Sequence, residues 1–113
     1  MTVTSGAYHT SADWPEIEAV PGVLRRVLAC GDEVMVVQFT IDEGAEVPAH
    51  SHPHEQVGLV LEGRAVFFIG GEQKVLQAGD FYRIPGHVRH RVRALDEPVR
   101  AVDIFHPIRE EYR

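Results

Sequence analysis

Hydrophobic positions in this chain recur in short runs that predict strands. Residues 35–41 read Met-Val-Val-Gln-Phe-Thr-Ile and are rich in β-branched side chains, and residues 99–105 read Val-Arg-Ala-Val-Asp-Ile-Phe. Gly, Pro or Asp interrupts the chain about every ten residues, and Glu62-Gly63 and Gly70-Gly71 both predict hairpins. Short strands at this spacing predict an all-β sandwich or small barrel.

The remaining elements follow from the same pattern. Residues 65–69 lack polar alternation and are expected to be buried on both faces, whereas only residues 107–112 have helical character. Residues 1–12 are small and polar, so we expect a flexible N-terminal segment followed by a single domain over residues 13–113. The expected strands cover residues 23–28, 35–41, 57–61, 64–69, 73–77, 81–84, 88–95 and 99–105.

Composition and charge narrow the classes of partner. A net charge of -6 argues against nucleic acid, because affinity for nucleic acid depends on cations that neutralise phosphates. The sequence has no apolar run of about 18 residues and no signal peptide, so we expect no membrane partner and a cytoplasmic protein. Ten arginines accompany the single Lys74, which suits bidentate carboxylate recognition, although genomic base composition explains this bias equally well. Cys30 is the single cysteine, so no internal disulfide can form.

Candidate metal ligands gather in residues 50–56, which we call the histidine row. His50, His52, His54 and Gln56 occupy every second position, and such positions share one face of an extended strand. Pro53 removes a backbone donor within the row, so we expect an edge strand or a bulge there. Imidazoles at this density without cysteine are typical of a divalent transition metal site, and the alternative is a histidine-rich surface loop.

Two stretches resemble the motifs of the cupin family. In residues 44–63, Gly44 is followed after five residues by His50-Ser51-His52, then by Gln56 and Gly63, with glutamine where the first motif has glutamate. In residues 79–94, Gly79, Pro85 and His90 are spaced as in the second motif. His87 and Ala94 depart from that motif, which has glycine and asparagine at the corresponding positions.

The resemblance implies a double-stranded β-helix, or jelly-roll, barrel that holds one metal ion, with a short C-terminal helical tail. It assigns the ligands to His50, His52, Gln56 and His90 and the cofactor to one divalent transition ion, such as Zn, Ni, Fe or Mn. A neutral glutamine leaves the charge of the ion uncompensated, which makes it a stronger Lewis acid. His54 and Glu55 lie beside these ligands and are expected to orient an imidazole or contact substrate.

A closer resemblance is to the KdgF family of pectin-degradation cupins. It rests on residues 50–56, on residues 102–112, and on Trp14 with Arg25-Arg26-Val27-Leu28. Members of this family convert 4,5-unsaturated monouronates from pectin or alginate breakdown into open-chain keto uronates. The resemblance implies an isomerase of uronate metabolism with a small anionic sugar as substrate. Family and pattern together predict a homodimer, which would cover exposed strand edges.

The last expected strand supplies candidate catalytic residues. Alternation places Asp103 and Phe105 on one face, and a carboxylate facing an apolar interior is costly unless it is paired or functional. Asp103 is either paired with an arginine or catalytic. The resemblance favours proton transfer by Asp103, carboxylate binding by Arg109 and packing of Phe105 against the sugar.

Arg89, Arg91 and Arg93 alternate with His90, so these arginines are expected to form a solvated face rather than a binding patch. Two other functions fit the same scaffold: an iron-dependent dioxygenase, and a non-enzymatic sensor that binds a small ligand or a metal.

Overall fold

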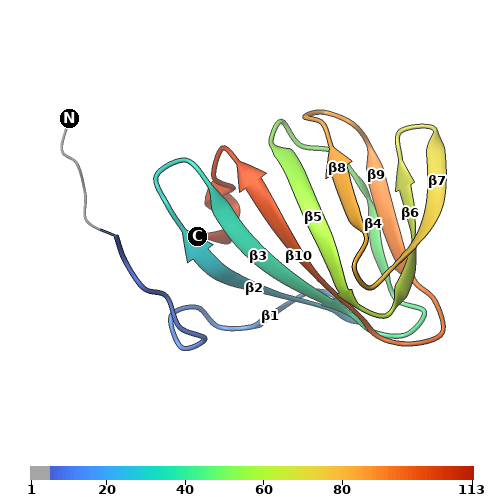
Figure 1. Cartoon of the computed structure of the whole chain (residues 1–113), viewed down its shortest axis with the longest axis horizontal. Coiled ribbons are helices and arrows are strands. Elements are labelled where there is room, and N and C mark those ends of the chain that lie inside the picture. Colours follow the sequence, from blue (N-terminus) through green and yellow to red (C-terminus); the bar gives the residue numbers. More distant parts are fainter. Residues whose placement is uncertain (1–5) are drawn as a thin grey trace.

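The structure, a computed structural model, describes residues 6–113 and is built almost entirely of strands (Figure 1). A single-turn 3₁₀ helix, η1, covers Glu110–Tyr112 near the C-terminus. The strands are β1 (Ile17–Val20), β2 (Val23–Cys30), β3 (Met35–Ile41), β4 (Glu46–His50), β5 (Glu55–Glu62), β6 (Arg64–Ile69), β7 (Glu72–Gln77), β8 (Phe81–Ile84), β9 (His90–Ala94) and β10 (Val99–His106).

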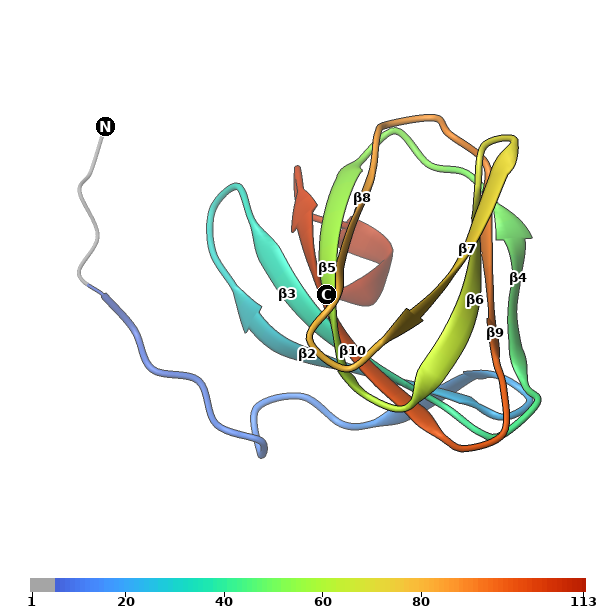
Figure 2. The ribbon, with the colours of Figure 1, turned by 45° about the vertical axis from the view of Figure 1, so that its right-hand side comes forward.

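The strands form two antiparallel sheets that face each other. One sheet has the order β1-β2-β3-β10-β5-β8, and the other has the order β4-β9-β6-β7. Figure 2 shows β5, β8 and β10 on one side of the interior and β4, β6, β7 and β9 on the other. The all-β prediction is confirmed, and the two-sheet arrangement is that of a jelly roll.

Two predictions about turns have different outcomes. Gly70 and Gly71 do connect β6 to β7 as an antiparallel hairpin. The hairpin predicted at Glu62-Gly63 is wrong, because β5 and β6 belong to different sheets and Gly63 carries the chain from one to the other. Gly63 has a φ of 81°, and a side chain there would collide with the Pro98 carbonyl oxygen. Close backbone approach, rather than a hairpin, therefore explains this glycine.

The histidine row does not form one strand. His50 ends β4, residues 51–54 form a loop, and Gln56 lies on β5 in the opposite sheet. The loop contains Pro53, whose ring removes a backbone donor from any ladder at that position. Strands β1 and β4 were missed by the sequence analysis, and the helical tail is shorter than predicted.

The buried face of β10 points between the two sheets. Ala101, Asp103 and Phe105 are buried while Ile104 is exposed, so the alternation predicted for Asp103 and Phe105 is confirmed. Phe105 belongs to an apolar cluster with Met35, and a second apolar cluster also packs in the interior. That second cluster comprises Val23, Ile41, Val60, Ala65, Phe67, Leu76, Tyr82, Ile84, Ala94 and Val99.

The N-terminal segment is described in part. Residues 1–5, on which part of the predicted flexible segment falls, lie outside the described residues, and residues 6–13 are exposed. Trp14 packs against the cluster that contains Phe105, so this aromatic docks onto the body of the domain. No helix within residues 6–113 is long and apolar enough to cross a membrane.

Candidate functional site

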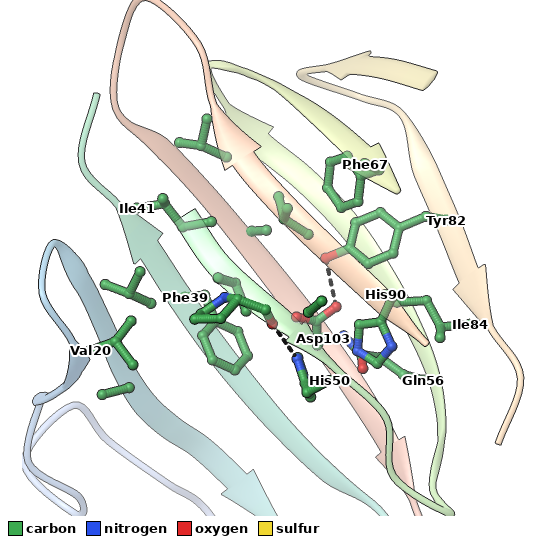
Figure 3. A pocket seen from close by; sticks show the side chains of 18 of the residues that line it. Val20, Phe39, Ile41, His50, Gln56, Phe67, Tyr82, Ile84, His90 and Asp103 are labelled. Atoms are coloured by element: carbon green, nitrogen blue, oxygen red, sulfur yellow. Dashed lines mark hydrogen bonds between the residues drawn. The ribbon is translucent and has the colours of Figure 1, made fainter. Parts of the chain in front are cut away.

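A pocket of about 260 Å³ lies between the two sheets (Figure 3). Much of its wall is apolar and includes Val23, Ile41 and Phe67. Its polar lining comes from both sheets and from the C-terminal segment. The polar and ionisable residues that line it are His50, Gln56, Tyr82, His90, Asp103, Arg109 and Tyr112. Most of the site residues predicted from the sequence therefore face one cavity.

Three histidines, His50, His52 and His90, lie close together, and we call them the histidine group; His50 and His90 line the pocket. His50 on β4 pairs in register with His90 on β9, and the loop after β4 brings His52 beside them. One ring nitrogen from each lies within 4.8 Å of the others. Such a cluster is the geometry required for several imidazoles to bind one ion.

Backbone carbonyls orient all three imidazoles. Nδ1 of His50 lies 2.8 Å from the carbonyl oxygen of Pro48. Nδ1 of His52 lies 3.1 Å from the carbonyl oxygen of His54, and Nδ1 of His90 lies 2.9 Å from that of Val88. A carbonyl can only accept, so each Nδ1 carries the proton and donates it, leaving a lone pair on Nε2. Histidines that bind metals through one ring nitrogen usually donate the N–H of the other to such an acceptor.

His90 gives a direct test of whether a metal fits. Its Nε2 is buried and finds no hydrogen-bond partner within residues 6–113, an arrangement that is costly for a polar atom. Burial lowers the pKa of His90, and burial with the nearby Arg109 charge lowers the pKa of His52 to about 4. Both rings are therefore neutral at neutral pH, the state in which imidazole binds metals. The histidine group thus fits a divalent transition ion.

Gln56 lies next to this group on β5. It is buried, and its Oε1 is 3.2 Å from Nε2 of His52. Because the His52 proton is on Nδ1, Nε2 and the amide oxygen approach each other as two acceptors. A shared cation would stabilise that pair, so the position of Gln56 fits the predicted fourth ligand.

Asp103 projects into the same cavity from β10. It is 3% exposed, and its Oδ1 accepts a 2.6 Å hydrogen bond from the hydroxyl of Tyr82. Burial raises the pKa of Asp103 to about 6, while hydrogen bonds with Tyr82 and Gln56 act in the opposite direction. No ion pair within residues 6–113 includes Asp103, so the predicted alternative of an arginine partner is wrong.

Arg109 is held at the edge of the pocket by the C-terminal segment. Its guanidinium donates to the Tyr112 hydroxyl at 2.7 Å and to Glu111 at 2.9 Å, and it lies over the rings of Tyr112 and Phe105. Its Nε is buried without a hydrogen-bond partner among residues 6–113. Phe105 also lines the pocket, with its ring centroid 5.8 Å from that of His52.

The structure separates the two residues that were grouped beside the ligands. His54 is half-buried, its carbonyl orients His52, and the two rings lie 5.4 Å apart. Glu55 is exposed and pairs with Arg83 at 3.1 Å outside the pocket. Because Gln56 faces inward, its neighbour on the strand must face outward, so the predicted role of Glu55 at the site is not supported.

Some residues at the site were missed by the sequence analysis, namely Tyr82, Glu111 and Tyr112. Tyr82 and Ile84 alternate with exposed neighbours on β8, but the run Phe-Tyr-Arg-Ile gave no signal for this, because the apolar Phe81 is one of the exposed residues. The contact of Tyr82 with Asp103 depends on strand pairing and had no signal either. The arginines beside His90 do face away from the pocket: Arg89 and Arg93 are exposed, and Arg91 pairs with Glu46.

Comparisons with known proteins agree with this fold. The Cupin domain family matches residues 37–105. The pectin degradation protein KdgF of Dickeya dadantii (strain 3937) is 29% identical over 106 residues, which are 93% of this chain and 96% of that protein.

Solved structures give the same result. An RmlC-like cupin from Shewanella frigidimarina NCIMB 400 has a TM-score of 0.88 and 32% identity, with 96% of this chain and 97% of that chain covered. KdgF from Halomonas sp. has a TM-score of 0.88 and 28% identity, with 96% and 100% covered. The chain therefore belongs to the cupin family and is similar to KdgF proteins.

Proposed function

We propose that this cupin is a metal-dependent enzyme that opens the ring of 4,5-unsaturated monouronates and converts them into open-chain keto uronates during pectin or alginate breakdown. One observation carries the proposal: a buried carboxyl, Asp103, faces the same small pocket as His50 and His90, whose Nε2 atoms are free to bind a metal. The likeness to KdgF proteins supports the substrate class.

The metal would be held by His50, His52 and His90, with the Gln56 amide oxygen completing the set. A divalent ion bound there would supply Lewis acidity that stabilises negative charge on a substrate oxygen. Burial keeps the imidazoles of His52 and His90 neutral, and the carbonyls of Pro48, His54 and Val88 orient all three rings.

Asp103 would move the proton. Ring opening breaks the bond between C1 and the ring oxygen and moves the proton of the C1 hydroxyl to that oxygen, which leaves an aldehyde at C1 and an enol. Ketonisation then removes the enol proton from oxygen and adds a proton to C4, so the overall reaction is an isomerisation without oxidant. A carboxyl with a pKa of about 6 can accept and return a proton near neutral pH.

Arg109 and Phe105 would position the sugar. The guanidinium of Arg109 is fixed by Tyr112 and Glu111 and can hydrogen-bond the substrate carboxylate, and the Phe105 ring can pack against the sugar face. The volume of about 260 Å³ is just below the range usual for ligand pockets, which suits a monosaccharide.

The proposal is tested by following the absorbance of the conjugated enol when metal-loaded protein is mixed with unsaturated galacturonate. Because ring opening also occurs spontaneously, the measured quantity is the rate above the protein-free reaction. We expect acceleration that is lost after chelation and in Asp103→Ala. No acceleration by metal-loaded protein would contradict the proposal; oxygen consumption would then favour a dioxygenase, and binding without turnover would favour a sensor.

We also propose that the protein is a homodimer. Val57, Phe81 and Ile104 are exposed apolar residues on three adjacent strands of the six-stranded sheet. A partner that covered them would remove this apolar surface from water. Light scattering of the purified protein gives the mass directly, and a monomeric mass would contradict the prediction.

A further inference from the structure

We propose that Tyr82 is a positioning residue that fixes the Asp103 carboxylate for proton transfer, and that Gly58 is the spacer that allows the two side chains to meet. The inference rests on the proposed function, because it assigns a role within that reaction. Its evidence is the register of three neighbouring strands, a buried hydrogen bond and the space around one glycine.

The register brings Tyr82 and Asp103 to opposite sides of one backbone position. Asp103 on β10 pairs with Gly58 on β5, and Gly58 pairs on its other edge with Tyr82 on β8. All three positions therefore point to the same face of the sheet. Neighbouring strands lie about 4.8 Å apart, so the two side chains must reach across the whole width of β5.

Gly58 is the residue that leaves this path open. A Cβ atom at position 58 would collide with Oδ1 of Asp103 and with Cζ and the hydroxyl oxygen of Tyr82. The backbone of Gly58 is in the ordinary extended region, so conformational freedom does not explain the glycine. Glycine inside a strand usually weakens it, and close approach of other groups is a common reason for its presence. Here the groups that approach are the tyrosine hydroxyl and the carboxylate.

The hydrogen bond restrains one oxygen of the carboxylate. The Tyr82 hydroxyl lies 2.6 Å from Oδ1, a short distance typical of a donor facing a charged acceptor. Tyr82 is buried, and its ring packs against Phe67 with centroids 4.4 Å apart, so the donor itself is held (Figure 3). With Oδ1 engaged, rotation of the carboxylate is restricted. The second oxygen is then kept in a defined orientation for the substrate.

This arrangement predicts an effect on turnover rather than on binding. A displacement of about 1 Å in a reacting group can slow an enzyme by about a hundredfold. Tyr82 does not contact the histidine group through any hydrogen bond within residues 6–113. Loss of its hydroxyl should therefore leave metal binding intact.

The kinetic test compares wild type with Tyr82→Phe, which keeps the buried ring and removes only the donor. We expect kcat to fall about ten- to a hundredfold with KM within about twofold, while metal stoichiometry and Tm stay close to wild type. Tyr112→Phe is the matched hydroxyl deletion at Arg109, where the larger change is expected in KM. Gly58→Ala keeps both functional groups but separates them, so in folded protein it should reproduce the loss in kcat.

A spectroscopic measurement reports the contact independently of the reaction. In proton NMR, the Tyr82 hydroxyl should give a slowly exchanging downfield resonance that is absent from Tyr82→Phe, Asp103→Ala and Gly58→Ala. Absence of this resonance from the wild type would contradict the contact. A Tyr82→Phe variant with normal kcat, in a wild type that turns over the uronate, would overturn this inference alone. Lack of turnover by the wild type would overturn the proposed function and the assigned role together.

Discussion

The two walls of the pocket are built in different ways. The three imidazoles of the histidine group are each oriented by a backbone carbonyl only two residues away in the sequence. On the facing sheet, the hydrogen bond between Tyr82 and Asp103 joins residues 21 apart and requires three strands in correct register. Orientation of the ligands is thus a local property of the chain, whereas the acid–base pair exists only in the folded sheet.

Burial has opposite consequences on the two walls. It lowers the pKa of His52 and His90, which keeps them neutral as metal ligands, and it raises the pKa of Asp103 towards neutrality. In each case burial disfavours the charged form. Burial in one cavity therefore favours both the neutral imidazoles and the raised carboxyl pKa, and substitutions should separate metal binding from proton transfer.

The largest loss of activity is expected from substitutions in the histidine group. His90→Ala should abolish stoichiometric metal binding and lower activity about a thousandfold, because metal catalysis contributes several kcal/mol to the barrier. Metal content by elemental analysis and the initial rate on unsaturated uronate test this together. His87→Asn is the matched control, since His87 is exposed with a φ of 68° that asparagine tolerates. Full activity without bound metal would contradict this division of roles.

Substitution of Asp103, on the facing sheet, should lower kcat without loss of the metal. Asp103→Asn removes the exchangeable acid while keeping an acceptor for Tyr82, and kcat should fall about a hundredfold or more. Metal stoichiometry should remain that of wild type, because Asp103 is not part of the histidine group. An Asp103→Asn protein that had lost its metal would show that the two walls are not separable in this way.

The opposite pKa shifts of Asp103 and His52 also predict how the free energy of unfolding depends on pH. Asp103 has a folded pKa of about 6 against an ordinary 3.8, so its contribution to stability is lost as pH rises between these values. His52 has a folded pKa of about 4 against 6.5, so its contribution is lost as pH falls through that range. Between about pH 4 and 6, the Asp103 contribution to the free energy of unfolding therefore falls as pH rises, while the His52 contribution increases.

Replacing Asp103 should leave only the His52 contribution to this pH dependence of the free energy of unfolding. In chelator-treated Asp103→Asn, the free energy of unfolding should rise with pH between 4 and 6.5 by about 2–3 kcal/mol more than in wild type. Urea denaturation at several pH values measures the difference. Parallel pH profiles for the two proteins would contradict the burial argument.

The smallest expected effect concerns Arg109. Glu111 is largely solvent-accessible and pairs with this arginine, so it competes with a substrate carboxylate for the guanidinium. Glu111→Gln removes that competing charge and should lower KM about two- to fivefold, within the range of exposed ion pairs. Steady-state kinetics test the change, with Glu110→Gln as control because Glu110 pairs with Arg113 instead. A raised KM would show that Glu111 supports substrate binding by Arg109.

The same contrast explains what could be predicted from the sequence. Spacing revealed the histidines and the cupin motifs, and alternation on the last strand placed Asp103 inside, because both signals lie within short stretches. The contact between Tyr82 and Asp103 could not be predicted, since it depends on which strands pair and in what register. Gly58 looked like an ordinary strand residue until its two neighbours across the sheet were known.

Errors in the turns have a similar origin. Glu62-Gly63 has the local chemistry of a hairpin, yet it connects two different sheets, and a φ of 81° together with the proximity of Pro98 explains the glycine. Gly70-Gly71 has comparable chemistry and does form the hairpin. The difference lies in tertiary packing, which local propensity does not encode.

The central claim is that Asp103 delivers a proton to C4 of the sugar within this pocket. The most direct measurement is the reaction in D₂O, with early product analysed by NMR for the face of C4 that carries deuterium. Spontaneous ketonisation should label both faces. The wild-type protein should label one face only, and Asp103→Asn should give the spontaneous mixture. A mixture from the wild type, or single-face labelling that persists in Asp103→Asn, would contradict the claim.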